Sequence, residues 1–385
     1  MKPSLMCVFG TRPEAIKMAP VVLALKEEQG LQVTVAVTGQ HRQMLDSVLR
    51  LFGIVPDFDL DILQQRQTLT EITTRVLERL TPVVESQRPD MVVVQGDTTT
   101  TFVGALVAFY HRVAVAHVEA GLRTGDPYSP FPEEVNRRLT TRLTNLHLAP
   151  TPRARQNLLN EGVASRHVVV TGNTVIDALR WAISRSARFD HPALIDLDEH
   201  SRPVLLVTTH RRETWGAPMV EVGKALAEIA VAEPRLIVVF PVHRNPVVRE
   251  AVLPPVTGLP NVRVVEPLGY ADFARLIARS TLVLTDSGGL QEEAPSLGKP
   301  VLVLRDTTER PEAVRAGTAR LVGTQKATVR DAVLGLLHDP HAYAAMATAV
   351  NPYGDGRAAG RVIAAIRHYF GQGGPPEQFQ QTTVT

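Results

Sequence analysis

Short apolar runs alternate with longer amphipathic stretches along most of this sequence, and this alternation constrains the fold most. The runs are continuous rather than alternating in polarity, which is typical of strands covered on both faces. Stretches with helical spacing of apolar residues separate them, over 14–29, 69–85, 219–232 and 329–337. Strand–helix alternation in two series predicts an α/β protein with two parallel, doubly wound sheets. The expected strands are Leu5–Phe9, Val33–Val37, Met91–Val94, Val113–Val118 and Leu146–Ala149 in the first half, and Val204–Val207, Leu236–Phe240, Val262–Val265, Leu282–Leu284 and Val301–Leu304 in the second.

The domain organisation follows from length and from breaks in this pattern. A chain of 385 residues favours two or three domains at about 150 residues each. Gly172-Asn173-Thr174 follows the strand-like run Val168–Val170 and is the best candidate for a hinge between the halves. The final residues contain Gly-Gly-Pro-Pro and then mostly Gln and Thr, which predicts a disordered tail over 371–385.

Charge and cysteine content exclude several classes of protein. Lys and Arg number 41 and Asp and Glu 39, a net charge of +2 that argues against nucleic-acid or polybasic membrane binding. The longest apolar run, Phe102–Tyr110, is about half the ~20 residues that a membrane span needs, and we find no signal-peptide pattern. The single cysteine, Cys7, excludes an internal disulfide and fits a reducing compartment. We therefore expect a cytoplasmic globular protein.

Polar residues gather where the predicted strands end. Gly10-Thr11-Arg12, Gly96-Asp97-Thr98 and Glu119 follow strands of the first half, and His210 and Asp286 follow strands of the second. In open α/β sheets, ligands bind outside the carboxyl ends of the strands. The pattern predicts one cleft between two facing sheets, with both halves contributing.

The first of two candidate anion sites lies at the turn after the first strand. Arg12 lies beside Gly10, where free backbone N–H groups and a guanidinium suit a phosphate. Lys17, about one helical turn further on, faces the same side, although alone it is more often a solvated charge. A capping box explains Thr11 and Glu14 without any ligand, but it does not explain Arg12. The string is neither the dinucleotide fingerprint nor a Walker A loop.

The second candidate is Ser287-Gly288-Gly289, also between a strand and a helix. Its paired glycines let a diphosphate approach the backbone closely. Glu292 and Glu293 follow in the first helical turn, where acids complement the helix dipole. A carboxylate there can instead accept hydrogen bonds from ribose hydroxyls, and for Glu293 the two interpretations are equally supported.

Several carboxylates are candidates for proton transfer. Asp97 and Glu119 end consecutive strands, which makes them neighbours in a parallel sheet. Glu133 and Glu134 open a helix, where complementation of the helix dipole is the alternative explanation. Carboxylates gathered in a partly closed cleft raise one another's pKa, which suits proton transfer near neutral pH. His210, within Thr-Thr-His-Arg-Arg-Glu, is the best basic candidate, while no histidine or cysteine spacing indicates a metal.

Together these strings resemble the non-hydrolysing UDP-N-acetylglucosamine 2-epimerases, and they run in family order over nearly the whole chain. The matching segments begin at Phe9-Gly10-Thr11-Arg12-Pro13-Glu14, Gly96-Asp97-Thr98-Thr99-Thr100, His117-Val118-Glu119-Ala120-Gly121, Pro132-Glu133-Glu134, Thr171-Gly172-Asn173-Thr174, His210-Arg211-Arg212-Glu213, Pro241-Val242-His243, Thr285-Asp286-Ser287-Gly288-Gly289, Thr308-Glu309-Arg310-Pro311-Glu312 and Asn351-Pro352-Tyr353-Gly354.

The resemblance implies a GT-B fold of two Rossmann-like domains, one over 1–170 with a helix at about 357–370 that crosses back, the other over 171–356. It implies interconversion of UDP-N-acetylglucosamine and UDP-N-acetylmannosamine, without NAD or metal and by a homodimer. The implied route eliminates UDP to a 2-acetamidoglucal and adds it back with inversion at C2.

The resemblance also implies roles for individual residues. Asp97, Glu119 and Glu133 correspond to acid/base carboxylates, and His210 to a histidine near the leaving group. Leu268 departs from the pattern, because some relatives have Gln there on the uracil side. Substrate contacts are implied for Arg12, Lys17, His243, Phe273, Ser287, Gly288, Gly289, Glu293 and Arg310, and a second, activating site for Gln40, His41, Gln43, Arg66, Arg211 and Glu213.

Three other functions remain open at this point. A hydrolysing epimerase would release UDP and free N-acetylmannosamine, although the Gln40–Gln43 and Arg66 signature favours the non-hydrolysing type. A GT-B glycosyltransferase would share the fold and the diphosphate site but would not require three carboxylates plus His210. A non-catalytic nucleotide-sugar sensor would not need to retain the acid/base candidates.

Overall fold

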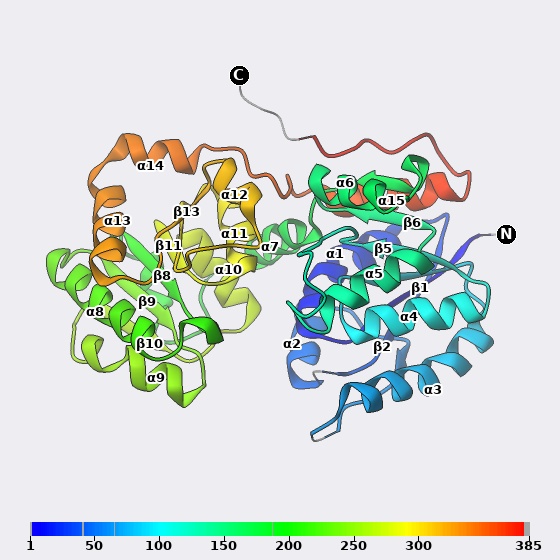
Figure 1. Ribbon diagram of the computed structural model, residues 1–385, viewed down its shortest axis with the longest axis horizontal. Coiled ribbons are helices and arrows are strands. Elements are labelled where there is room, and N and C mark those ends of the chain that lie inside the picture. The colour runs from blue at the N-terminus through cyan, green and yellow to red at the C-terminus, as the bar shows by residue number, and fades with distance from the viewer. Residues whose placement is uncertain (1, 41, 65, 187, 381–385) are drawn as a thin grey trace. The chain divides into compact units, whose positions relative to one another are not determined.

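The computed structural model describes residues 2–40, 42–64, 66–186 and 188–380, which form two compact units (Figure 1). The first unit is Met1–Trp181 with Tyr353–Gln380, and the second is Ala182–Pro352. Helix α7 (Thr174–Arg185) therefore begins in the first unit, past the boundary expected at residue 170. The Asp177 carboxylate explains this, because it accepts the backbone N–H groups of Ala358 and Ala359 and so ties α7 to the start of α15 (Ala358–Tyr369).

The first unit contains a seven-stranded sheet in the order β3-β2-β1-β4-β5-β6-β7, with every pairing parallel. The strand order reverses between β1 and β4, which is where a doubly wound sheet binds its ligand. The strands are β1 (Ser4–Phe9), β2 (Gln32–Val37), β3 (Phe58–Asp59), β4 (Met91–Gln95), β5 (Ala114–Val118), β6 (Leu146–Ala149) and β7 (Val168–Val170).

Helices pack on this sheet in two groups. Helices α3, α4 and α5 lie side by side, and α1 contacts both α2 and α15 (Figure 1). Met6 and Val8 of β1 belong to the core beneath α3 and α4, and side chains alternate between the two faces along a strand. These helices are α1 (Arg12–Glu27), α2 (Arg42–Phe52), α3 (Leu69–Gln87), α4 (Thr99–Tyr110), α5 (Glu133–Leu143) and α6 (Pro152–Asn160), with α7 and α15 as above.

The second unit repeats this plan with a six-stranded parallel sheet in the order β10-β9-β8-β11-β12-β13. Its order reverses between β8 and β11, and its core lies between the sheet and helices α8 and α13.

The strands of this sheet are β8 (Val204–Thr208), β9 (Ile237–Pro241), β10 (Val262–Val265), β11 (Leu282–Thr285), β12 (Val301–Val303) and β13 (Ala319–Leu321). The helices of the second unit are α8 (Ala217–Ala232), α9 (Pro246–Val252), α10 (Tyr270–Arg279), α11 (Gly288–Glu293), α12 (Pro311–Arg315), α13 (Lys326–His338) and α14 (Pro340–Ala347).

The segment 371–380, expected to be disordered, contacts the edge strand β7. The Phe379 N–H donates to the Val170 carbonyl at 2.7 Å, and Phe379 is buried with the Arg361 guanidinium 5.6 Å from its ring centroid. The polar composition concealed this contact because one aromatic residue and an unpaired strand edge supply it. Residues 381–385 lie outside the described part of the chain.

Two searches of the described residues bear on membranes and metals. No described helix combines the length and the apolar character needed to cross a bilayer. Within the same residues, no group of three or more His, Cys, Asp or Glu side chains is arranged to hold a metal ion.

Candidate active site

Glu119 is the centre of a polar cluster in the first unit, at the carboxyl end of β5. Its Oε1 accepts from Nζ of Lys17 at 2.5 Å and from Nδ2 of Asn173 at 3.0 Å, and its Oε2 accepts from Nε2 of Gln95 at 2.5 Å. The residue is 8% exposed and has a φ of +67°, in the left-handed region that side chains other than glycine rarely adopt. One cation and two amides therefore restrain the position of this carboxylate.

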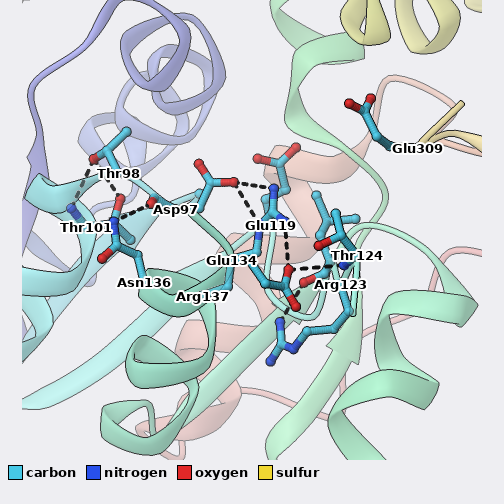
Figure 2. A network of polar contacts seen from close by, with 12 residues as sticks. Asp97, Thr98, Thr101, Glu119, Arg123, Thr124, Glu134, Asn136, Arg137 and Glu309 are labelled. Atoms are coloured by element: carbon cyan, nitrogen blue, oxygen red, sulfur yellow. Dashed lines mark hydrogen bonds and ion pairs between the residues drawn. The ribbon is translucent and has the colours of Figure 1, made fainter. Parts of the chain in front are cut away.

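Asp97 lies at the end of the neighbouring strand β4, and helix α5 holds it at two points (Figure 2). Its Oδ2 accepts from Nε and Nη2 of Arg137 at 2.9 and 2.7 Å, and its carbonyl accepts from Nδ2 of Asn136 at 3.0 Å. A Cβ placed on Gly96 would lie 3.7 Å from Oε2 of Glu119, so the Glu119 carboxylate lies beside the turn that carries Asp97. The structure thus brings these two predicted carboxylates to one edge of the sheet.

Glu134, rather than the predicted Glu133, joins this network (Figure 2). Glu134 is completely buried and accepts the backbone N–H groups of Thr124 and Gly125 and the guanidinium of Arg137. Burial opposes its ionisation, but these hydrogen bonds outweigh burial and hold the pKa of Glu134 below its usual value. Glu133 is half-buried, and no described residue is hydrogen-bonded to its carboxylate. Its acid/base role therefore stays a prediction.

The turn at Gly10-Thr11-Arg12 corrects an expectation. The Glu14 carboxylate accepts the backbone N–H groups of Gly10 and Thr11 at 2.9 and 2.7 Å, so these groups are not free for a phosphate. The expected capping box of Thr11 and Glu14 is confirmed. Burial raises the pKa of Glu14, although hydrogen bonds from Thr98 and from the turn oppose that rise. These two backbone groups are therefore no part of a phosphate site, and the contact of Arg12 with an anion stays a prediction.

Two histidines buried beside the cluster were not considered as site residues. His117 on β5 and His147 on β6 are register partners in the sheet, and Nε2 of His117 lies 2.7 Å from the Gly96 carbonyl. Burial lowers the pKa of His117 to about 4 and that of His147 to about 3. Both imidazoles are therefore neutral at physiological pH.

Asp286 and His210 form the corresponding cluster in the second unit, where β11 and β8 end. The buried Oδ2 of Asp286 accepts the N–H groups of His210 and Arg211 at 2.7 and 2.8 Å and the Thr209 hydroxyl at 3.0 Å. Nδ1 of His210 lies 3.0 Å from Oδ1. Burial opposes ionisation of Asp286, but contact with His210 and these hydrogen bonds lower its pKa.

Two other predicted contacts lie near this pair. The His243 ring stacks beside that of His210, with 6.1 Å between the ring centroids. The pKa of His243 is lowered, mainly because the ring is partly buried and also because His210 lies nearby. A Cβ on Gly288 would lie 3.5 Å from Oε2 of Glu309, so the glycine leaves room for a close approach at this turn.

The remaining predicted nucleotide contacts are distributed over α10, α11 and the loop before α12. Arg310 forms an ion pair with the buried Glu292. Glu292 therefore compensates the charge of an arginine, in addition to the interaction with the helix dipole that its position predicts. Glu293 is buried and accepts from the Tyr270 hydroxyl at 3.4 Å. Phe273 is half-buried on α10, and Leu268 is buried, so its side chain contributes no polar group.

The residues expected at a second site divide between the two units. Oε1 of Gln40 accepts from the Thr100 hydroxyl at 3.4 Å, while Gln43 and Arg66 are exposed. In the second unit, Arg211 pairs with Glu309 at 3.3 Å and Glu213 with Arg305 at 3.2 Å. His41 lies outside the described residues.

The sequence alone assigns no role to four of these groups. Gln95 and Asp286 follow predicted strands, and this position is the signal that could have indicated both. Arg137 lies three residues after Glu134 on α5, the spacing of an ion pair on one helix face. The hinge predicted at Gly172-Asn173-Thr174 does not indicate the hydrogen bond of Asn173 to Glu119, because that bond joins residues 54 positions apart.

Comparison with known proteins gives a consistent result. A family model described as UDP-N-acetylglucosamine 2-epimerase matches residues 23–367. The UDP-N-acetylglucosamine 2-epimerase of Escherichia coli strain K12 is 53% identical over 366 residues, covering 94% of this chain and 97% of that protein. S. aureus MnaA, solved as a co-structure with UDP, is 48% identical with a TM-score of 0.87, covering 99% of this chain and 100% of that chain.

Two further structures extend the comparison. The UDP-GlcNAc 2-epimerase of Neisseria meningitidis bound to UDP-GlcNAc is 46% identical with a TM-score of 0.85, covering 95% of this chain and 100% of that one. The glycotransferase of kitacinnamycin is 15% identical with a TM-score of 0.64, covering 97% and 99%, and shares the fold alone. The α/β, GT-B fold class predicted from sequence is confirmed. By its family match and its identity to these proteins over nearly its whole length, this chain belongs to the UDP-N-acetylglucosamine 2-epimerase family.

Proposed function

We propose that the protein interconverts UDP-N-acetylglucosamine and UDP-N-acetylmannosamine without hydrolysing them. The observation that carries this proposal is the pair of carboxylates at the ends of β4 and β5, Asp97 held by Arg137 and Glu119 held by Lys17. Inversion at one carbon needs a base on one face of the sugar and an acid on the other, and two fixed carboxylates can supply both.

The chemistry of the substrate selects elimination over direct proton abstraction. The C2 proton is not adjacent to a carbonyl, so its removal is slow unless the C1–O bond breaks ahead of it. In the proposed step, UDP leaves with the electron pair of the C1–O bond, a carboxylate takes the C2 proton, and a C1=C2 double bond forms. Addition reverses this step, except that the proton returns to the opposite face of C2. A phosphate oxygen of UDP bonds to C1 again on the face that it left, so only C2 is inverted.

The proposal assigns proton transfer to the first unit and the nucleotide to the second. Asp97 and Glu119 are the acid/base pair, with Glu133 as a further candidate. Arg12, His210 and the Ser287-Gly288-Gly289 backbone would stabilise the departing diphosphate, the electrostatic task in this reaction.

Other candidate contacts would recognise the rest of the nucleotide. Glu293 suits ribose, because it is a buried carboxylate close to the Tyr270 hydroxyl. His243, Phe273 and Arg310 complete the proposed set. Lys17, which forms an ion pair with Glu119, stays a candidate for the diphosphate.

We also propose a second, activating site for substrate that uses Gln40, Gln43, Arg66, Arg211 and Glu213, and a homodimer as the working form. Sigmoidal initial rates in UDP-N-acetylglucosamine, made hyperbolic by Arg66→Ala, would support the activating site. Light scattering on the purified chain would report the oligomeric state.

Incubation with UDP-N-acetylglucosamine in D2O, followed by NMR, tests the main proposal. Epimerisation predicts deuterium at C2 and a UDP-linked manno product, with little free UDP. Stoichiometric free UDP and free N-acetylmannosamine would instead identify a hydrolysing epimerase. Transfer of the sugar to an added acceptor would indicate a glycosyltransferase, and binding without turnover would indicate a sensor.

A further inference from the structure

Both carboxylate oxygens of Asp286 contact the segment Thr209–Arg211, which carries His210. One oxygen, Oδ2, accepts from the backbone N–H groups of His210 and Arg211 and from the Thr209 hydroxyl. The other oxygen, Oδ1, lies 3.0 Å from Nδ1 of His210. Asp286 is completely buried, whereas the His210 side chain is 41% exposed. A buried carboxylate therefore lies behind an imidazole that remains accessible.

This arrangement restrains the position of the ring. Because the backbone N–H groups occupy Oδ2, Oδ1 is the oxygen that faces the imidazole, with Nδ1 at ion-pair distance from it. The Trp215 indole N–H donates to the His210 carbonyl at 3.3 Å and restrains the backbone from the other side. Nε2 is then the ring nitrogen left for a ligand.

The charged groups around His210 come from three elements. Arg211 and Arg212 follow it along the chain, with Arg212 lying over the Trp215 ring. The His243 ring stacks beside it from the loop after β9, and Asp286 faces it from the end of β11. Asp286 is the carboxylate within ion-pair distance of the His210 ring among the described residues.

We propose that Asp286 is a positioning residue, which holds Nδ1 of His210 protonated and stabilises the doubly protonated imidazolium. Nε2–H then faces the phosphate oxygen of UDP that departs from C1. This inference rests on the proposed function, since it concerns the leaving group of that reaction. When the C1–O bond breaks, the negative charge on the phosphate is matched by the imidazolium, whose own charge Asp286 balances.

Asp286→Asn tests this charge balance with little change of shape. The amide oxygen is expected to accept the two backbone N–H groups, which turns the amide NH2 toward Nδ1 and forces that nitrogen to act as acceptor. We expect kcat to fall about 10- to 100-fold, a part of what a positioned general acid supplies. We expect KM and the dissociation constant of UDP to stay within about twofold, so that the loss lies in kcat alone.

Thr209→Val is the matched control, because it removes one donor to Oδ2 and leaves the contact with Nδ1 intact. We expect its kcat to stay within about twofold of wild type. A wild-type kcat in Asp286→Asn, or equal losses of kcat in both variants, would refute the positioning role.

A spectroscopic measurement keeps the inference testable if Asp286→Asn does not fold. In wild-type protein labelled with 15N-histidine, with the His210 resonances assigned by their loss in His210→Gln, we expect Nδ1 to be protonated. The Nε2–H tautomer in wild type would overturn the inference whatever the kinetics show. Failure of the proposed function is distinguishable, because it would appear as absent C2 exchange in wild-type protein that still shows a protonated Nδ1.

Discussion

The ammonium of Lys17 lies 2.5 Å from Oε1 of Glu119, so this lysine pairs with a buried carboxylate of its own chain. The two residues are 102 positions apart, on α1 and at the end of β5. Their side chains are 19% and 6% exposed, so solvent screens the pair only partly. Lys17 therefore compensates the charge of the carboxylate that we propose as one of the acid/base pair.

Lys17→Met should destabilise the first unit, because it leaves the Glu119 carboxylate buried beside two amides without its cation. We expect the free energy of unfolding to fall by about 2–4 kcal/mol, as when one partner of a buried ion pair is removed. Urea unfolding measures this. Lys17→Met with Glu119→Gln should regain most of the loss, and strict additivity of the two single changes would show that the pair is not coupled.

Asp97→Asn should abolish exchange at C2 while UDP still binds. The amide keeps the shape of Asp97 and its contact with α5 but cannot accept a proton at neutral pH. Deuterium incorporation measured by NMR and UDP binding measured by calorimetry separate the two effects. Wild-type exchange in this variant would remove Asp97 from the mechanism.

Arg137→Met should lower turnover much more than Arg138→Met, although both side chains reach Glu134. Only Arg137 also holds the Asp97 carboxylate, with two nitrogens on Oδ2, while Arg138 is largely exposed. We expect at least a tenfold loss of kcat for Arg137→Met and less than twofold for Arg138→Met, measured by coupled assay of the epimer. Equal losses of kcat in the two variants would show that the arginines act through Glu134, which holds the loop at Thr124 and Gly125, and not through Asp97.

The first unit should lose stability on acidification between about pH 6.5 and pH 4, through His117 and His147. Their pKa values are depressed from 6.5 to about 4 and about 3 in the folded state, so the unfolded chain binds more protons in this range. Their contribution is complete above pH 6.5, and each imidazole adds a slope of about 1.4 kcal/mol per pH unit below it.

Urea titrations with Trp215→Phe, which leaves Trp181 of the first unit as the remaining tryptophan, would measure that slope. In the His147→Gln variant, the unfolding free energy should depend less steeply on pH than in the Trp215→Phe parent. Replacement of the exposed His341 by Gln should leave this slope unchanged. The same slope in all three proteins would exclude His147 as a source.

Gly10→Ala and Gly360→Ala should have opposite effects on stability. A Cβ on Gly10 would lie 1.7 Å from Oγ1 of Thr38, whereas one on Gly360 would meet no described atom within 4 Å. We expect Gly10→Ala to destabilise strongly, by overpacking at the end of β1. Gly360→Ala should stabilise α15 by up to about 1 kcal/mol, because alanine has the higher helix propensity. Thermal unfolding of both variants measures the difference.

Most of the strands could be predicted from sequence, because a parallel sheet covered on both faces needs runs such as Leu5–Phe9 and Met91–Val94. The two-residue strand β3 could not, since Phe58–Asp59 carries too few residues for any periodicity. β13 was missed for a similar reason, because Ala319–Leu321 contains an exposed arginine. Position along the chain likewise predicted which residues lie at the strand ends.

The place of a residue in the sequence could not predict which side chains form hydrogen bonds or ion pairs with one another. The turn after β1 reads as an anion site, but the chain supplies its own carboxylate there through Glu14. Of two adjacent glutamates at the start of α5, only the burial pattern of the folded helix distinguishes Glu134 from Glu133. The ion pairs of Lys17 and Arg310 could not be predicted either. Glu119, the partner of Lys17, is distant in sequence, and Glu292, the partner of Arg310, lies on a different element, helix α11.

The division of the chain has a consequence for how the protein is made. The second unit, Ala182–Pro352, is continuous and is synthesised whole before Tyr353–Gln380, the residues that complete the first unit, have been translated. Those residues include α15, which packs on α1, and Phe379, which covers the edge of β7. Domains usually complete folding from the N-terminus during synthesis, but here the unit that emerges first is completed last. A ribosome that stops just after codon 352 would release a chain with a complete second unit and a first sheet whose β7 edge is uncovered. Such products would be selectively exposed to proteases.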